Sequence, residues 1–291
     1  MTEGGGTYQA CKSCLRGMLG LVYSTILASL ALFSCNGIMG VEIRAQTHST
    51  SSSEFGFVPP DPSLLTDATT IPLRSSYPTH FDLYDYLTPV KNQQACGACW
   101  DFATTAAFES KVLYSLKDAN PSLDFVGTRV DLSEQDIICR PLCYPNPWTC
   151  SSGCCGGWAL PAMQLLATVG ALPEASCPYG NFVGVCGLQR CSNCAQTNRI
   201  YLGYGQVFWN ANKEFLMQML LDYKVPLIVS MVVYSDFCTG CPNPGHCGSP
   251  ITNGGIYKLT AGASPCGGDV EHSGHEVVIY GYDTTSTDPS K

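Results

Sequence analysis

A cysteine pair and a glutamine in one short stretch provide residue types that acyl transfer needs. Cys96 and Cys99 belong to the run Cys-Gly-Ala-Cys-Trp, and Gln93 lies six residues before Cys99. Apolar residues recur at helical spacing from Cys99 to about Leu116, which predicts that Cys99 lies at or near a helix N-terminus. Free N–H groups and the helix dipole favour a thiolate there, so we expect a lowered pKa for the Cys99 thiol. The Gln93 amide can donate a hydrogen bond to a developing oxyanion, so the stretch provides half of a nucleophilic acyl-transfer site.

Two other kinds of site use a Cys-x-x-Cys pair. A redox pair also lies at a helix N-terminus, but in a thioredoxin-like motif the Trp precedes the first Cys, whereas Trp100 follows the second. A zinc knuckle needs a second ligand pair at matching spacing. The position of Trp100 therefore favours a hydrolytic nucleophile, and a thiol–disulfide oxidoreductase is the competing enzyme class.

The elements around this stretch divide into a helical half and a strand-rich half. After the Cys99 helix, Ser133 has the residue type and position of a helix N-cap, with Asp136 three residues further on. Apolar spacing predicts a helix over Trp158–Val169, and from about Arg199 the pattern changes to strands. The expected strands and the helix between them are Ile200–Val207, Lys213–Tyr223 and Val225–Val233.

The stretch Pro89–Trp100, Pro-Val-Lys-Asn-Gln-Gln-Ala-Cys-Gly-Ala-Cys-Trp, resembles the active-site signature of the papain-like cysteine peptidases. Four further motifs of that family follow in the family's order, so the resemblance covers roughly Tyr77–Asp283. They are Leu-Ser-Glu-Gln at 132–135, Gly-Cys-Cys-Gly-Gly at 153–157, Gly-Gly-Ile-Tyr at 254–257, and Gly-His with an apolar strand and Gly-Tyr at 274–282. The fold that this resemblance implies is α+β in two lobes. A helical lobe carries Cys99, a β-barrel-like lobe carries a histidine, and substrate lies in the cleft between them.

The resemblance implies a role for each reactive residue. Cys99 is the nucleophile, Gln93 the oxyanion donor and His275 the general base and acid. His275 lies 176 residues after Cys99, beyond the family's usual interval of about 130–150, and the Cys-rich loops between them account for the excess. His272 competes with His275, but its surroundings are loop-like, so we prefer His275. The implied function is peptide-bond hydrolysis through a thioester acyl-enzyme, by an endopeptidase or exopeptidase that needs no cofactor.

The Gly-Cys-Cys-Gly-Gly turn has two further roles by resemblance. Cys154 pairs with Cys96 in a disulfide, although a neighbouring cysteine leaves the pairing ambiguous. The backbone at Gly156 and Gly157 offers strand-like hydrogen bonds to a bound peptide, and Trp158 is expected to belong to the same substrate-binding site. Glycine suits this place because a side chain would block the approach of the peptide.

The third catalytic residue of the family is an asparagine shortly after the histidine strand, where it orients the imidazole. No asparagine occurs between His275 and Lys291, and Asp283 and Asp288 both have turn-like surroundings. We therefore expect the sequence to be C-terminally incomplete, without the last strands of the β lobe. The competing function is a catalytically inactive papain-like binding protein, or a fragment that lacks the orienting asparagine.

The domain boundaries follow from these patterns. Residues 1–41 combine a basic flank with an apolar run and are expected to be a signal peptide, or a signal anchor through Met18–Val41. Residues 42–76 are rich in Ser, Thr and Pro and are expected to be a disordered linker or a short pro-segment. The peptidase domain and its two lobes are expected at 77–291, about 90–195 and about 196–291.

Composition limits the partners and the compartment. The chain of 291 residues has a net charge of −8, and its 15 Lys and Arg form no cluster, which argues against nucleic acid and leaves peptides or proteins as expected partners. Its 18 cysteines indicate disulfides, so we expect the secretory pathway, with an extracellular or a lysosome- or vacuole-like destination. Two Cys-x-x-Cys pairs, Cys191/Cys194 and Cys238/Cys241, could form a zinc site, but disulfides are preferred and no metal is assigned.

Overall fold

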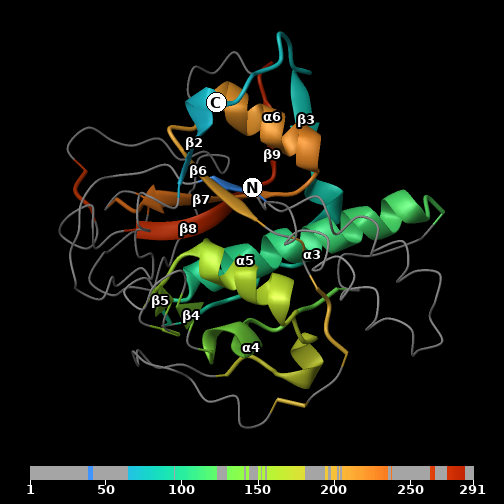
Figure 1. Cartoon of the computed structure of the whole chain (residues 1–291), viewed down its shortest axis with the longest axis vertical. Helices are drawn as coiled ribbons and strands as arrows, with labels where there is room; N and C mark the ends of the chain where they lie inside the picture. Colours follow the sequence, from blue (N-terminus) through green and yellow to red (C-terminus); the bar gives the residue numbers. More distant parts are fainter. Residues whose placement is uncertain are drawn as a thin grey trace, which may run out of the picture.

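The chain combines a helical lobe with a sheet-containing lobe (Figure 1). The computed structural model describes residues 39–41, 65–94, 96–122, 130–140, 142–143, 150–151, 153–154, 156–180, 194–195, 198–201, 203, 205–234, 237, 263–265 and 274–285. The helical lobe holds α3 (Cys99–Ala119), α4 (Glu134–Ile138), α5 (Ala159–Thr168) and a two-stranded sheet of β4 (Leu142–Cys143) and β5 (Cys150–Ser151). The second lobe holds β1 (Met39–Val41), β2 (Thr66–Asp67), β3 (His80–Asp82), β6 (Gln206–Trp209), α6 (Lys213–Tyr223), β7 (Leu227–Val232), β8 (Gly274–Ile279) and β9 (Gly281–Asp283). The short 3-10 helices are η2 (Ala68–Thr70), η3 (Tyr84–Tyr86) and η5 (Glu174–Ser176). The expected α+β, two-lobed class is confirmed.

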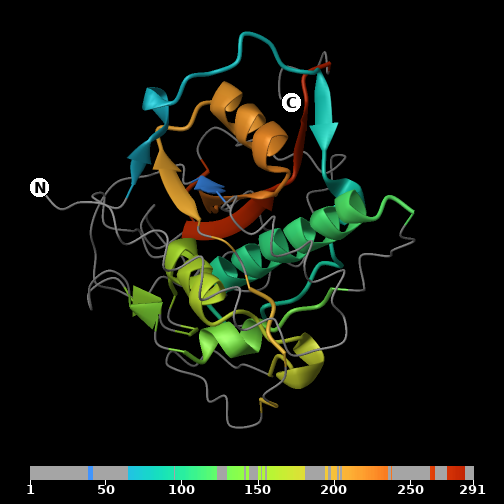
Figure 2. The same ribbon diagram turned by 45° about the vertical axis from the view of Figure 1, so that its right-hand side comes forward.

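Helix α3 is the element that joins the two lobes. It begins at Cys99, as predicted, and ends at Ala119, three residues beyond the predicted end. It packs against α4 and α5 in the helical lobe and against β7 and β8 in the other, and β8 lies beside it in both ribbon views (Figures 1 and 2). Its largest fully buried side chains are Trp100, Phe108 and Leu113. Burial of such side chains on both sides of one helix is what fixes the lobes against it.

The main sheet of the second lobe has five strands in the order β2-β6-β1-β7-β8. Strands β7 and β8 pair antiparallel, whereas β1 pairs parallel with both of its neighbours. Helix α6 occupies the predicted range, and the side chain of Asn212 caps it by accepting from the N–H of Phe215 at 2.8 Å. Strand β7 lies within its predicted range, but β6 begins at Gln206, so the strand predicted from Ile200 is shifted towards the C-terminus.

The structure describes part of the N-terminal ranges. Of residues 42–76, expected to be a disordered linker or a short pro-segment, it describes residues 65–76, which contact the domain as β2, η2 and the segment that follows. The amide side chain of Gln218 on α6 holds this segment, because it donates to Pro72 O at 3.0 Å and accepts from Arg74 N at 2.8 Å. Local composition does not reveal such long-range contacts.

Of residues 1–41, the structure describes the last three. They form β1, which pairs with β6 and β7. The remaining residues of the range, and residues 42–64, lie outside the described parts. Among the helices that the structure describes, none is long and apolar enough to cross a membrane.

Candidate active site

Cys99 is the first residue of α3 and lies in the interior. Its side chain is 1% exposed and forms no disulfide. The turn before it is held from the helical lobe by a disulfide between Cys96 and Cys154, which is the pair that the resemblance implies. Beside the disulfide, the N–H of Gly97 donates to Cys154 O at 3.2 Å. These two links fix the position of the first turn of α3 and, with it, the position of the Cys99 thiol.

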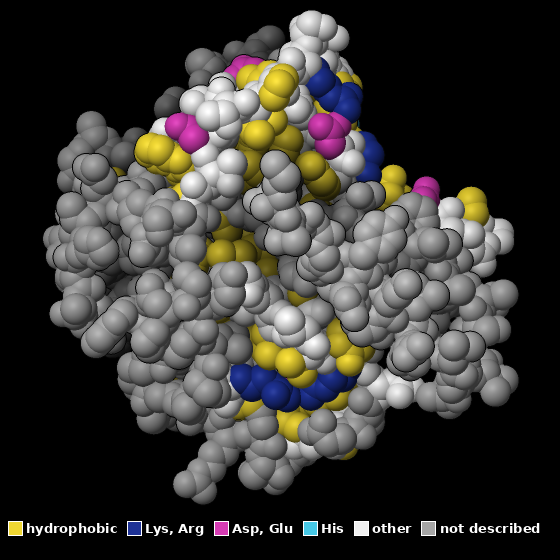
Figure 3. Space-filling model, viewed as in Figure 1, with side chains coloured by type: hydrophobic (Ala, Val, Ile, Leu, Met, Phe, Trp, Pro, Cys, Tyr) yellow, Lys and Arg dark blue, Asp and Glu magenta, His cyan; other side chains and the backbone are white. Residues whose placement is uncertain are grey.

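His275 lies on strand β8, which packs against the helix that begins at Cys99. In the β7–β8 ladder His275 pairs with Met231, and β8 packs against α3. The backbone N–H of the next residue, Glu276, hydrogen-bonds the Cys99 thiol. His275 is therefore adjacent in the chain to a residue that touches the sulfur, and its side chain is half-buried. In the space-filling view, hydrophobic side chains are visible at the centre of the face shown, between the upper and lower groups of described residues (Figure 3).

The thiol of Cys99 has a perturbed acidity, and the direction is opposite to the prediction. Burial raises its pKa, and the carboxylate of Glu276 raises it further. Backbone N–H groups of Glu276, Trp100 and Cys99 itself act in the lowering direction, which is the effect expected at a helix N-terminus. The expected effect is thus present, but desolvation outweighs it because α3 and β8 exclude water from the sulfur.

Gln93 lies three residues before the disulfide, in the loop that leads into α3. Its side-chain Nε2 donates to Cys96 O at 2.9 Å, and its carbonyl accepts from the Tyr179 hydroxyl at 2.9 Å. The amide is therefore oriented by the turn that precedes Cys99. An amide nitrogen carries two hydrogens, so this bond uses half of its donor capacity.

The turn that follows Cys154 has the backbone form that the sequence suggests. Gly156 has φ +101°, a backbone conformation that residues other than glycine rarely adopt. Gly156 and Gly157 are buried in the structure, and the Trp158 side chain is 2% exposed and belongs to the main hydrophobic cluster. Trp158 immediately precedes α5 and anchors the turn through packing.

Helix α4 supports the loop through contacts that the sequence did not reveal. Its N-cap Ser133 accepts from Asp136 N at 3.0 Å, as predicted, and also donates to Cys177 O. Gln135 Oε1 accepts from Gly180 N at 3.1 Å, which places the Tyr179 hydroxyl at Gln93. Helix α4 therefore positions the segment that carries Tyr179, and Tyr179 in turn bonds Gln93, the predicted oxyanion donor.

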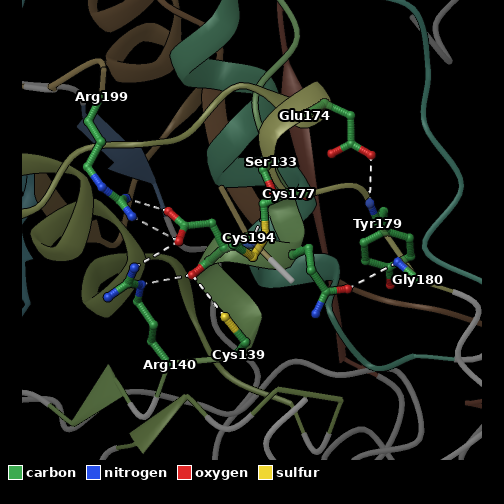
Figure 4. The surroundings of a disulfide bond; sticks show 11 residues. Ser133, Cys139, Arg140, Glu174, Cys177, Tyr179, Gly180, Cys194 and Arg199 are labelled. Carbon is green, nitrogen blue, oxygen red and sulfur yellow. Dashed lines mark hydrogen bonds and ion pairs between the residues drawn. A yellow bond between two sulfur atoms is a disulfide. The ribbon is translucent and has the colours of Figure 1, made fainter. Parts of the chain in front are cut away.

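A second disulfide lies beside α4 and joins Cys177 to Cys194 (Figure 4). It removes Cys194 from the alternative zinc site, whose other three cysteines lie outside the described residues. In Figure 4, Arg140 and Arg199 reach the same carboxylate, that of Asp136, at 2.8 and 2.5 Å. These charged bonds hold the pKa of Asp136 below its usual range, although burial opposes them. Within the described ranges, no group of three or more His, Cys, Asp or Glu is arranged to hold a metal.

Lys91 lies at the centre of a partly buried ion cluster beside the loop that leads into α3. Its ammonium lies 2.9 Å from Glu109, 3.0 Å from Glu134 and 2.9 Å from Asp131, and it donates to Leu132 O at 2.7 Å. The carboxylates raise the pKa of Lys91 against the effect of burial, and burial raises the pKa of Glu134 against the effect of Lys91. The cluster ties the loop to α3 and α4 at once. A cavity of about 360 Å³ opens beside it, and neither Cys99 nor His275 lines that cavity.

Several candidates from the sequence cannot be placed. His272, Asp288 and the segment 254–257 lie outside the described residues. Asp283 is described at the end of β9, where its Oδ1 accepts from Thr285 N at 2.8 Å and Thr285 Oγ1 at 2.6 Å. That bonding agrees with the turn-like surroundings inferred for it.

Comparison with known proteins identifies relatives of this chain. A family model described as papain family cysteine protease matches residues 77–290. Fruit bromelain of Ananas comosus is 26% identical over 216 residues, which cover 73% of this chain and 49% of the relative. Probable cysteine protease RD19B of Arabidopsis thaliana is 39% identical over 119 residues, 39% of this chain and 30% of that protein. Mexicain of Jacaratia mexicana is 29% identical over 204 residues, 68% of this chain and 73% of that protein. The chain thus spans about half of fruit bromelain and less of RD19B.

A solved structure supports the fold independently. It comes from work on the limited antibody cross-reactivity between the mite allergens Blo t 1 and Der p 1. It superposes with a TM-score of 0.51 and 17% identity, over 94% of this chain and 85% of that chain. At this identity the match bears on the fold alone.

Proposed function

Because this chain belongs to the papain family of cysteine proteases, we propose that it hydrolyses peptide bonds with Cys99 as the nucleophile. The observation that carries the proposal is the placement of Cys99 at the first turn of α3, against the strand that bears His275. A thiol that forms no disulfide, at a helix N-terminus packed against a strand that carries a histidine, supports nucleophilic acyl transfer. The proposed substrates are peptides or proteins, and the chemistry needs no cofactor.

In this mechanism His275 removes the Cys99 proton, and the thiolate attacks the scissile carbonyl carbon. The oxyanion that forms accepts hydrogen bonds from the backbone N–H of Cys99 and from the second hydrogen of the Gln93 amide. His275 then protonates the leaving amine, which leaves a thioester between the substrate acyl group and Cys99. Water, deprotonated by His275, attacks the thioester and releases the acid and the thiol.

The raised pKa of the Cys99 thiol gives His275 a specific task. A thiol that burial keeps protonated is a weak nucleophile, so its activation depends on transfer of the proton to a nearby base. The imidazolium that results stabilises the thiolate by charge. The proposal therefore predicts that loss of His275 costs activation of the thiol as well as protonation of the leaving group.

The turn at Gly156 and Gly157 is proposed to bind the substrate backbone. The Cys96–Cys154 disulfide joins this turn to the loop before Cys99, so the two move as one unit. An extended peptide beside the glycines would run past the thiol. Trp158, buried beneath, would support the turn rather than touch the peptide.

For localisation we infer the secretory pathway, with an extracellular or lysosome- or vacuole-like destination. Disulfides at Cys96–Cys154 and Cys177–Cys194 support an oxidising compartment. Membrane anchoring through Met18–Val41 is the finer possibility within this proposal. Protease protection of the chain in sealed membranes, with and without detergent, distinguishes an anchored from a released form.

The test is active-site labelling of the 291-residue chain with a peptidyl epoxide, located by mass spectrometry. We expect labelling at Cys99, loss of labelling in Cys99→Ala and in His275→Ala, and peptide hydrolysis by the wild type alone. Circular dichroism shows whether each variant is folded. A folded wild type that is neither labelled nor active would overturn the proposal and favour a binding protein on this fold.

A further inference from the structure

The cavity beside the loop that leads into α3 has no part in the proposed reaction. Its volume is about 360 Å³, which falls within the size range of small-molecule sites. Neither Cys99 nor His275 lines it. Two residues that do, Val90 and Asp131, have exposed side chains, so the cavity is open to solvent. It is therefore a second candidate site, separate from the proposed nucleophile and base.

One part of the cavity wall is aromatic and aliphatic. The rings of Phe102 and Tyr179 meet edge to face with their centroids 5.0 Å apart, and both residues line the cavity. Val130 and Pro89 add aliphatic surface beside them. Aromatic rings pack favourably against another flat ring, in an offset or an edge-to-face arrangement. This part of the wall therefore suits the apolar body of an organic ligand.

The rest of the wall is rich in carboxyl groups. Asp131, Glu134 and Glu174 all line the cavity. Lys91 is the one cation among the described residues that line it. The Lys91 ammonium is already surrounded, because it lies 2.9–3.0 Å from three carboxyl oxygens, one of which belongs to Glu109. The wall therefore holds more acidic groups than its own cation can pair.

Glu174 carries an oxygen that has no donor among the described residues. Its Oε1 accepts from Tyr179 N at 2.7 Å. Its Oε2 is buried and makes no hydrogen bond with the described part of the chain. Nearly all buried polar atoms in folded proteins have a partner, because an unpaired one is costly. A cavity-lining residue with such an atom calls for a donor from outside the chain.

The acidity of the wall agrees with a shortage of positive charge. Burial raises the pKa of Glu174, and the neighbouring carboxyls of Asp131 and Glu109 add to the effect. Burial also raises the pKa of Glu134 to about 8, although Lys91 opposes the rise. A cation bound in the cavity would stabilise the ionised carboxylates and so offset the cost of burying them.

We propose that this cavity is a binding site for a small organic cation with a flat apolar body, such as an aromatic amidine. The charged N–H groups of such a ligand donate to the carboxylates of Glu174 and Asp131. Its ring packs against Phe102 and Tyr179. An anion would be repelled by the carboxyls, and a neutral ligand would leave their charge uncompensated. The site does not rest on the proposed peptidase activity.

The test is isothermal titration calorimetry of the 291-residue chain with benzamidine at pH 8. Benzamide, which has the same shape without the charge, is the comparison probe. We expect one benzamidine per chain with a Kd below about 1 mM, and benzamide binding at least about tenfold weaker. Glu174→Gln should weaken benzamidine binding about tenfold. Glutamine keeps an acceptor for Tyr179 N, so this variant removes the charge without removing that bond.

The matched control is Glu214→Gln, which makes the same substitution at an exposed position of α6 away from the cavity lining. It should leave the Kd unchanged. If Glu174→Gln does not fold, Asp131→Asn removes a cavity carboxylate at an exposed position and gives the same readout.

Three results would overturn the proposal. The first is a folded wild-type chain that gives no binding heat with benzamidine. The second is an affinity that neither Glu174→Gln nor Asp131→Asn changes, because the probe would then bind elsewhere, for example in the substrate cleft. The third is equal affinity for benzamide and benzamidine, because the charge would then not be recognised.

The calorimetry is independent of peptide hydrolysis. A chain that binds benzamidine in this cavity but cleaves no peptide would remove the proposed function and leave the cation site intact. A chain that cleaves peptides but gives no benzamidine binding would do the reverse. The two proposals therefore fail separately.

Discussion

The buried carboxyl of Asp101 should make the stability of the fold fall as the pH rises. Asp101 lies in the first turn of α3 and is 0% exposed. Its Oδ1 lies 3.2 Å from the Thr105 hydroxyl, while its Oδ2 makes no hydrogen bond with the described residues. Burial raises its pKa well above the ordinary value of 3.8, and the nearby carboxylate of Glu134 adds to the effect. The folded protein therefore keeps a proton that the unfolded chain releases.

The size of the effect follows from this proton. Because the folded-state pKa is raised, the stabilising contribution is complete below about pH 4 and is lost as the pH rises towards the folded-state pKa. One proton gives a slope of at most about 1.4 kcal/mol per pH unit, which applies over the pH range where the folded protein keeps the proton and the unfolded chain has released it. Asp101→Asn carries no such proton. The unfolding free energy of the variant, relative to wild type, should therefore increase as the pH rises from 5 to 7, by up to about 1.4 kcal/mol per pH unit.

The assay is urea denaturation at pH 5, 6 and 7, followed by tryptophan fluorescence. Asp118→Asn is the matched control, because it makes the same substitution at an exposed position of the same helix. The other titrating groups are shared by variant and wild type, so their contributions cancel. A difference between Asp101→Asn and wild type that is constant from pH 5 to pH 7 would mean that Asp101 is already ionised in the fold, which would refute the reasoning.

Three further outcomes are expected. Cys99→Ala should abolish peptide hydrolysis while the thermal midpoint stays within a few degrees of wild type, and retained hydrolysis would refute the site assignment. Lys91→Met should destabilise by about 3–5 kcal/mol in urea denaturation, because it leaves buried carboxylates such as Glu134 without their cation; a change below 1 kcal/mol would contradict this. Replacing Cys96 and Cys154 together by Ser should cost about 4 kcal/mol, since the bridge spans 58 residues, and an unchanged denaturation midpoint would show that the bridge does not constrain the unfolded chain.

The features that the sequence predicted correctly are those with local signals. The start of α3 at Cys99 follows from apolar spacing, and the side chain of the predicted cap Ser133 bonds an N–H three residues on. The ends of α6 coincide with the predicted range. In each case the helix boundary is determined by a few residues that are neighbours in the sequence.

The features that the sequence did not predict depend on residues that are far away along the chain. The acidity of Cys99 depends on β8, whose residues lie more than 170 positions away along the chain, so local reasoning saw the helix end but not the desolvation. The ordering of residues 65–76 depends on Gln218 of α6. The Cys177–Cys194 bridge was one of many possible pairings of the remaining cysteines. Each of these properties depends on which distant residues pack against a given side chain. The spacing of residues in the sequence does not reveal those contacts.

The loop before Cys99 is fixed from three directions, and this has a consequence for the proposed reaction. Lys91 ties its beginning to α3 and α4, Tyr179 holds the Gln93 carbonyl, and the Cys96 disulfide holds its end. Two of these links pass through α4, because Gln135 positions the segment that carries Tyr179. Donors that are held in place before substrate binds need no reorganisation when the oxyanion forms, and that is the condition under which they lower a barrier most. A perturbation of α4, distant from the thiol, should therefore reduce kcat rather than raise KM.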